Sequence, residues 1–275
     1  MNHKGKIKLF ILGVFTFICS CKDTAEKEVE KPKLAETPVE NIAYKVVQSF
    51  PHDITLFTEG LLWSNGHLYE STGSPEELDV KSMIGISDLK SGKFEKKIEL
   101  DKKIYFGEGI VILNDKVYQL TYKNQTGFIY DLKTFKKLGE FKFSNAEGWG
   151  LTTNGSQIIM SDGTETLSFL DPANMQPVKT LKVTDNGLAL PYINELEFIN
   201  GFIYANVWTT NFIVKIDPES GKVMGRIDLA PLVYEARTKN PKADVLNGIA
   251  YDAAANKIYV TGKLWPNIYE LDFPH

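Results

Sequence analysis

The stretch that decides the fold is Gly60-Leu61-Leu62-Trp63-Ser64-Asn65-Gly66-His67-Leu68-Tyr69-Glu70-Ser71-Thr72-Gly73. Two apolar runs flank Asn65-Gly66, and this dipeptide favours a tight hairpin because both residues tolerate a positive φ angle. The second run carries a single carboxylate, Glu70, near its end. Taken alone, Glu70 has the position of a solvated glutamate at a strand end, but the same hairpin recurs along the chain.

The hairpin belongs to an internal repeat with a period in the forties. Its tight turns recur at Asn65, Asn114, Asn154, Asn200 and Asn256, and a later aspartate opens a second turn in each unit, at Asp88, Asp131, Asp171, Asp217 and Asp272. Five such units predict an all-β, five-bladed β-propeller. The last unit has three strands, so we expect a strand at 43–50 to complete it and close the ring without exposed edges.

The N-terminal residues read as an export signal. Three lysines precede the apolar run 9–18, which is too short to span a bilayer as a permanent helix. The run ends in Ile18-Cys19-Ser20-Cys21, which resembles a bacterial lipobox, and the alternative is an ordinary signal peptide with incidental cysteines. We therefore predict a lipoprotein signal peptide at 1–20 and lipidation of Cys21.

Composition divides the rest of the chain. Residues 21–41 are rich in Lys, Glu, Thr and Pro and read as a flexible tether, followed by the propeller domain at 42–275. These features predict an exported protein, lipid-anchored on the periplasmic side of a bacterial cell envelope, with the outer membrane as the expected location.

Charge and residue usage exclude several classes of function. The net charge of −4 supplies no basic surface for nucleic acid. Cys19 and Cys21 are the only cysteines, so the mature domain has no disulfide and no thiol nucleophile. The histidines are scattered and lack zinc-ligand spacing. We expect a monomer that needs no cofactor, with a structural calcium ion on the propeller axis as the one exception.

Blade topology places one set of polar and aromatic residues on a single face. The start of each first strand and the end of each second strand reach the same side of an antiparallel hairpin. This mouth gathers Phe57, Glu59, Glu70, Glu108, Tyr122, Glu147, Asn194, Glu197, Trp208 and Lys263. A polar pocket with aromatic walls is typical of a small-molecule site. We expect Glu108, Glu147 and Glu197 to satisfy crowded backbone amides, and Lys263 to need an anionic partner or a ligand.

A family resemblance follows from motifs spread over residues 45–275. They are Phe57-Thr-Glu-Gly-Leu61, Leu68-Tyr-Glu-Ser-Thr-Gly73, Tyr105-Phe-Gly-Glu-Gly109, Tyr118-Gln-Leu-Thr121, Glu147-Gly-Trp-Gly-Leu151, Met160-Ser-Asp-Gly163, Asn194-Glu-Leu-Glu197, Tyr204-Ala-Asn-Val-Trp208, Leu246-Asn-Gly-Ile-Ala-Tyr-Asp252 and Val260-Thr-Gly-Lys263. Taken in order, they resemble the plant- and bacterial-type glutaminyl-peptide cyclotransferases.

The resemblance implies a five-bladed propeller that converts the N-terminal glutamine of a peptide or protein to pyroglutamate and releases ammonia. It also implies that Glu70 is the catalytic glutamate and that Asn194, Trp208 and Lys263 are pocket residues. The chain departs from the family pattern by having Glu59 for glutamine and Tyr122 for tryptophan, and by lacking Leu-Tyr-Gly after Gly73. The departures add negative charge and remove an aromatic wall.

The expected reaction is an attack of the substrate α-amine on its own side-chain carboxamide. Glu70 would act as general base and then as general acid, and Lys263 or a side-chain amide would stabilise the carbonyl oxygen. Phe57, Glu59 and Tyr122 would bind the substrate with the other pocket residues. Two alternatives stay open: a non-catalytic surface propeller that binds peptides or glycans, and a metal-dependent, lactonase-like propeller.

Overall fold

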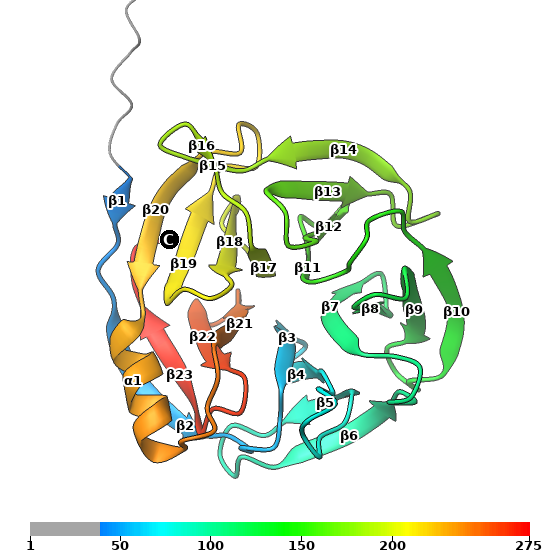
Figure 1. Cartoon of the computed structure of the whole chain (residues 1–275), viewed down its shortest axis with the longest axis horizontal. Coiled ribbons are helices and arrows are strands. Elements are labelled where there is room, and N and C mark those ends of the chain that lie inside the picture. The colour runs from blue at the N-terminus through cyan, green and yellow to red at the C-terminus, as the bar shows by residue number, and fades with distance from the viewer. Residues whose placement is uncertain (1–38) are drawn as a thin grey trace, which may run out of the picture. The chain divides into compact units, whose positions relative to one another are not determined.

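The computed structural model describes residues 39–275, so the predicted signal peptide and Cys21 lie outside the described residues. Twenty-three strands and one helix form a ring of sheets around a central axis (Figure 1). Within 39–275 no helix is long and apolar enough to cross a membrane.

Four of the five blades are meanders of four consecutive strands that run outward from the axis. Blade 1 contains β3 (Thr58–Ser64), β4 (His67–Thr72), β5 (Met83–Ser87) and β6 (Phe94–Glu99). Blade 2 contains β7 (Gly107–Leu113), β8 (Lys116–Thr121), β9 (Thr126–Asp131) and β10 (Lys137–Lys142). Blade 3 contains β11 (Leu151–Thr153), β12 (Ile158–Met160), β13 (Thr166–Leu170) and β14 (Pro177–Lys182). Blade 4 contains β17 (Ile193–Ile199), β18 (Phe202–Val207), β19 (Phe212–Ile216) and β20 (Val223–Asp228).

Blade 5 closes the ring with a strand from the other end of the domain. Its first three strands are β21 (Leu246–Asp252), β22 (Lys257–Gly262) and β23 (Asn267–Asp272). Strand β2 (Lys45–Pro51) pairs antiparallel with β23, from Lys45 opposite Asp272 to Pro51 opposite Asn267, with a register shift between Val46 and Gln48. The predicted five-bladed propeller and its N-terminal closing strand are thereby confirmed.

A short strand lies just before residue 42, where the propeller domain was expected to begin. Strand β1 (Glu40–Asn41) pairs in parallel with β20, so these residues form a fifth strand of blade 4. The polar composition of this segment concealed the pairing, because an edge strand needs backbone hydrogen bonds and not apolar side chains.

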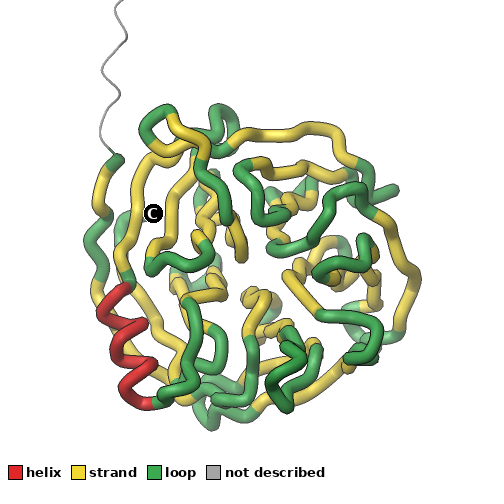
Figure 2. Tube along the Cα trace, viewed as in Figure 1, coloured by secondary structure: helices red, strands yellow, loops and turns green. Residues whose placement is uncertain are grey.

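The predicted turns and insertions have physical counterparts in the backbone. Asn65, Asn114, Asn200 and Asn256 have φ angles between 48° and 54°, as tight hairpin turns require. The insertion near 184–193 forms the small hairpin β15 (Thr184–Asp185) and β16 (Leu188–Ala189). The insertion at 229–245 contains helix α1 (Ala230–Lys239), which lies on the outside of the ring beside blades 4 and 5 (Figure 2).

The core is divided into five apolar clusters, one at each junction between neighbouring blades. The cluster between blades 4 and 5 has 17 buried residues, whereas the cluster between blades 5 and 1 has five. The junction where the ring closes, which we call the seam, is therefore the least apolar one.

Candidate functional site

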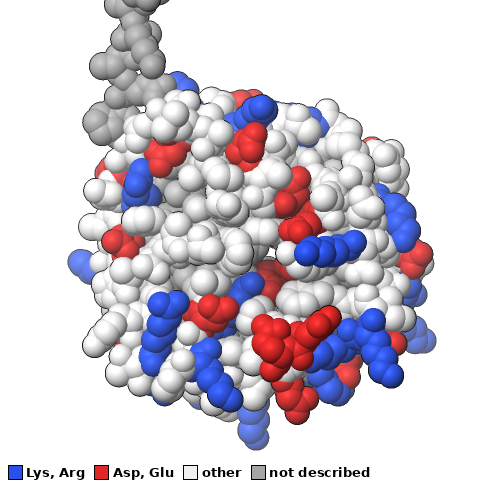
Figure 3. Space-filling view, in the orientation of Figure 1, with Lys and Arg blue, Asp and Glu red and all other residues white. Residues whose placement is uncertain are grey.

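A pocket of about 530 Å³ opens at the axis, on the face where the first strands begin. Acidic and basic side chains gather around the hollow at the centre of this face (Figure 3). The lining residues are Phe57, Glu59, Pro75, Phe106, Glu108, Tyr122, Ala146, Glu147, Trp149, Asp162, Gly163, Thr164, Tyr192, Asn194, Trp208 and Lys263. All six substrate-binding residues predicted from the sequence are among them.

Three of the polar lining residues, Glu59, Glu108 and Asn194, lie at β-bulges. The pairing of β3 with β4 skips Glu59, the pairing of β7 with β8 skips Glu108 and Gly109, and the pairing of β17 with β18 skips Asn194 and Glu195. A bulge breaks the alternation of side chains and turns the extra residue away from its expected face. Each of these innermost strands therefore presents a polar side chain to the axis, where a regular strand would not.

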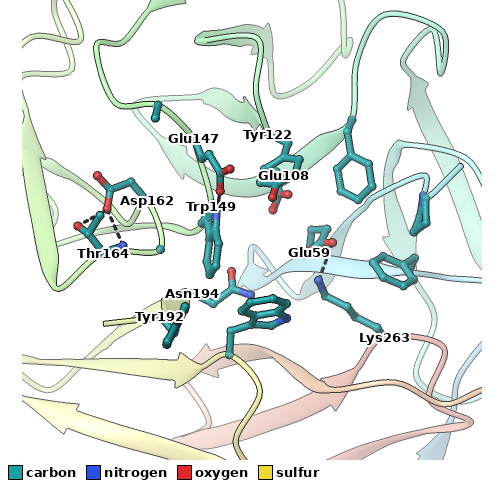
Figure 4. A pocket seen from close by; sticks show the side chains of 16 residues that line it. Glu59, Glu108, Tyr122, Glu147, Trp149, Asp162, Thr164, Tyr192, Asn194 and Lys263 are labelled. Atoms are coloured by element: carbon teal, nitrogen blue, oxygen red, sulfur yellow. Dashed lines mark hydrogen bonds and ion pairs between the residues drawn. The ribbon is translucent and has the colours of Figure 1, made fainter. Parts of the chain in front are cut away.

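An ion pair joins the two blades on either side of the seam. Lys263, which follows β22 of blade 5, places its Nζ 2.7 Å from Oε1 of Glu59 in blade 1 (Figure 4). The same Nζ lies 4.7 Å from the ring centre of Phe57, within cation–π range. Both charged side chains are nearly inaccessible to solvent. The prediction that Lys263 has an anionic partner is confirmed.

Glu108 is a buried carboxyl group that faces the pocket. Burial first, and then the negative charge of Glu59, raise the pKa of Glu108 well above the usual value, and Lys263 offsets only part of this. The carboxyl groups of Glu59 and Glu108 line the same pocket. A carboxyl group with a raised pKa in a pocket has the properties of a general acid–base group near neutral pH.

Aromatic rings form the walls of the pocket. Trp149 and Trp208 meet edge to face with centroids 5.6 Å apart, and Tyr192 lies 5.9 Å from Trp208. On the other side Phe106 contacts Tyr122, with a centroid separation of 5.8 Å. Trp208 is 38% exposed and Tyr192 is 49% exposed, so these two rings border the entrance.

Asn194 lies between the carboxyl groups and the aromatic walls. Its side chain is buried, and its Oδ1 has no hydrogen-bond partner among the described residues. A buried amide oxygen without a donor is costly unless a ligand or water supplies one. Asn194 is therefore poised to accept a hydrogen bond from a bound molecule.

Glu70 lies elsewhere than the sequence analysis expected. It does not line the pocket but is fully buried within blade 1, in the regular part of β4 opposite Leu61. Nε2 of His52 lies 3.1 Å from both carboxylate oxygens, and the hydroxyls of Thr58 and Ser87 donate to them at 2.7 Å. Four hydrogen bonds leave this carboxylate no access to a ligand in the pocket.

The environment of Glu70 indicates a buried ion pair. Nδ1 of His52 donates to the carbonyl of Trp265 at 2.8 Å, so both ring nitrogens face acceptors and the imidazole is cationic. Burial opposes this charge, but Glu70 outweighs burial and raises the pKa of His52. Burial also raises the pKa of Glu70, and the charge of His52 with the three donor side chains lowers it overall.

The three glutamates expected to satisfy backbone amides have different roles. Oε1 of Glu197 accepts a hydrogen bond from the backbone N–H of Tyr251 at 2.8 Å, as predicted. Glu147 instead accepts one from Nε1 of Trp149 at 2.9 Å and so orients a pocket wall. For Glu108 the prediction is wrong, because its carboxyl group faces the pocket and Glu59.

The sequence analysis assigned no binding role to Phe106, Trp149 or Tyr192, which all line the pocket. The first two lie in the motifs that it quoted, directly beside the glycines of Phe106-Gly107 and Gly148-Trp149-Gly150. Small residues next to an aromatic at a strand start are the signal that could have indicated them. Tyr192 lies in an insertion and has a φ of 66°, a conformation that sequence does not reveal.

Side chains of the types that bind metal ions do not gather in larger groups among the described residues. Residues 39–275 contain no group of three or more histidine, cysteine, aspartate or glutamate side chains that could hold one. The nearest acidic pair in the pocket, Glu59 and Glu108, is already neutralised in part by Lys263.

The structure is a closed five-bladed propeller with one pocket at its axis. Two carboxyl groups, an ammonium group and aromatic walls line this pocket, so the protein belongs to the class of propellers with an acid–base site for a small ligand or a chain terminus. The model of the glutamine cyclotransferase family matches residues 15–273. A glutaminyl-peptide cyclotransferase of Arabidopsis thaliana is 42% identical over 229 residues, which are 82% of this chain and 70% of that protein. The crystal structure of Myxococcus xanthus glutaminyl cyclase matches with a TM-score of 0.78 and 32% identity, over 86% of this chain and 98% of that one. This chain belongs to the glutamine cyclotransferase family.

Proposed function

We propose that this protein is a glutaminyl-peptide cyclotransferase in which Glu108 carries the proton. Family membership and the 42% identical relative support the activity. The observation that carries the assignment of Glu108 is its place in the pocket, as a buried carboxyl group with a raised pKa. Glu108 thus takes the role that the sequence analysis gave to Glu70, which is enclosed by its own hydrogen bonds.

The reaction needs one proton carrier and a folded substrate. The α-amine and the carboxamide belong to one molecule, so the pocket mainly holds the side chain in an attack geometry. The bond from the amine nitrogen to the carboxamide carbon forms, and the bond from that carbon to the amide nitrogen breaks. Glu108 takes the proton that the amine loses and gives it to the nitrogen that leaves as ammonia.

The other lining residues account for binding. The ammonium group of Lys263 is the pocket cation that can stabilise negative charge on the carboxamide oxygen. The free Oδ1 of Asn194 can accept a hydrogen bond from the substrate amide. Trp149 and Trp208 enclose the aliphatic part of the side chain, and Phe57, Glu59 and Tyr122 complete the pocket. In this proposal the expected partner is a peptide or protein with N-terminal glutamine.

The test compares Glu108→Gln with Glu70→Gln by ammonia release from a glutaminyl dipeptide. Glu108→Gln keeps the shape of the side chain but cannot exchange protons, so kcat should fall by about 10²- to 10⁴-fold with little change in KM. The melting temperature of Glu108→Gln should match that of the parent protein. Turnover by Glu108→Gln at the parent rate would refute the assignment, and loss in a fully folded Glu70→Gln protein would return the role to Glu70.

We also propose that the chemistry needs no metal ion, because a carboxyl group and a lysine can supply both the proton transfer and the charge stabilisation. Exhaustive chelation should then leave turnover of the same dipeptide largely intact. A structural calcium ion on the axis would show as a lower melting temperature after chelation without loss of rate at moderate temperature. Inactivation by chelator that zinc reverses would contradict this proposal.

A further inference from the structure

Three ionisable side chains are buried together at the seam end of the pocket. Glu59 is 1% exposed, Glu108 is 6% exposed and Lys263 is 7% exposed. If all three were ionised, two carboxylates would face one ammonium group. An unmatched buried charge is costly, and two carboxylates at one site do not both ionise readily.

The hydrogen bonds show which carboxylate the lysine holds. Oε1 of Glu59 lies 2.7 Å from Nζ of Lys263, and its Oε2 lies 3.3 Å from Nδ2 of Asn247. Both oxygens of Glu59 thus face donors. Glu59 is therefore the ionised partner of Lys263, and Glu108, buried in the same pocket without a cation of its own, is the group that holds the proton.

The surrounding charges favour keeping that proton. Besides Lys263, the charged neighbour of Glu59 is Asp244, and the further charged neighbour of Glu108 is Glu147. Both of these neighbours are acidic. Lys263 is the cation that faces the pair, through its ion pair with Glu59.

We propose that Glu59 and Glu108 form a carboxyl pair that holds one proton in the free enzyme, and that Glu59 thereby sets the acid limit of the reaction. The inference rests on the proposed function, in which Glu108 carries the proton. A glutamine at position 59, as in the family pattern, would place no second negative charge in the pocket beside Glu108. The pair is thus a property of this chain, with Glu59 acting on the reaction through Glu108 and not only as a binding residue.

The consequence appears in the pH dependence of kcat/KM. At low pH Glu108 keeps the proton of the pair and cannot accept one from the substrate, so the acid limb follows the loss of this proton. In Glu59→Gln the like charge is absent and Lys263 is free to turn toward Glu108, so the carboxyl group ionises at lower pH. The acid limb of the profile should therefore move down by at least about one pH unit.

The experiment measures kcat/KM against pH for the parent and three variants with one glutaminyl dipeptide, so that the substrate amine is the same throughout. Glu59→Gln should shift the acid limb to lower pH. Lys263→Met removes the stabilising cation and should shift it to higher pH. Glu147→Gln is the matched control, because it removes the same charge from the pocket at a more distant point and should shift the limb less than Glu59→Gln does.

An acid limb in Glu59→Gln that coincides with the parent limb overturns the pair, as does an equal shift in Glu147→Gln. If Glu59→Gln does not melt cooperatively, Lys263→Met decides, and an unmoved or lowered limb in that variant overturns the pair. A parent protein without turnover of any glutaminyl peptide overturns the proposed function and the pair together, whereas an active parent with unmoved limbs overturns the pair alone.

Discussion

At the scale of single residues, the buried ion pair of His52 and Glu70 predicts how the stability of the fold depends on pH. Because the pKa of Glu70 is lowered, its contribution to stability is present above the unfolded-state pKa and is lost as the pH falls through the folded-state value. Because the pKa of His52 is raised, its contribution is present below the unfolded-state pKa and is lost as the pH rises through the folded-state value. Both contributions are complete between about pH 4.5 and pH 6.5.

Glu70→Gln should therefore lower the free energy of unfolding by about 3 to 5 kcal/mol near pH 6, because it leaves a buried cation without its partner. The difference from the parent should shrink at alkaline pH, where His52 is neutral in both proteins. Denaturant unfolding at the two pH values measures this. Ser87→Ala is the control, with a loss of about 1 to 3 kcal/mol that stays the same at both pH values.

Glu70 and Glu108 also show what the sequence could not predict about single residues. Glu70 and Glu108 both lie in short motifs rich in glycine and threonine near strand ends, and both motifs belong to the family pattern. Their environments differ because β4 is regular at Glu70, whereas the pairing of β7 is interrupted at Glu108. A two-residue alternation cannot show a bulge, so the sequence could not reveal that Glu108 faces the pocket and Glu70 does not.

At the scale of elements, prediction succeeded where backbone chemistry repeats. The Asn turns with positive φ and the count of strands per unit required the blades, and the unpaired run at 43–50 required a closing strand. Strand β1 and the small hairpin β15–β16 escaped prediction, because two-residue strands have no periodicity. The pocket face followed from topology alone, and of the residues predicted at the mouth only Glu70 and Glu197 do not line the pocket.

The closing strand β2 makes its own prediction. Most of its side chains are exposed, and Phe50 is the half-buried one, packed against Tyr259 with centroids 6.1 Å apart. Phe50→Ala should lower the free energy of unfolding by about 1 to 3 kcal/mol, less than a fully buried phenylalanine would. Val47→Ala, on the same strand but 58% exposed, should change it by less than about 0.5 kcal/mol. Equal effects of the two changes would mean that β2 holds the ring through its backbone only.

At the scale of the whole molecule, we propose that a lipid anchor at Cys21 would hold the enzyme on a membrane. Residues between Cys21 and β1 would form the tether, and the expected site is the periplasmic side of the outer membrane of a bacterial cell. Cys21→Ala should release active enzyme into the soluble fraction, because the acylated thiol would be the membrane attachment. Membrane retention of the variant in a fractionation experiment would argue against lipidation.

The last prediction concerns where the ring opens. The seam between blades 5 and 1 has the smallest apolar cluster, with five buried residues, yet both buried ion pairs described above lie at or beside it. Buried ion pairs contribute little net stability compared with apolar packing, so the seam should be the weakest junction of the ring.

Native-state hydrogen exchange tests this, because amides exchange through local openings whose free energies differ along the chain. Amides of β2 and β3 should exchange through openings of lower free energy than those of β17 and β18, which adjoin the larger clusters. The difference in opening free energy between these two sets of strands should narrow at a pH where His52 is protonated and where Glu59 and Glu108 together hold one proton. Uniform protection around the ring would show that the two ion pairs make the seam as strong as the apolar junctions.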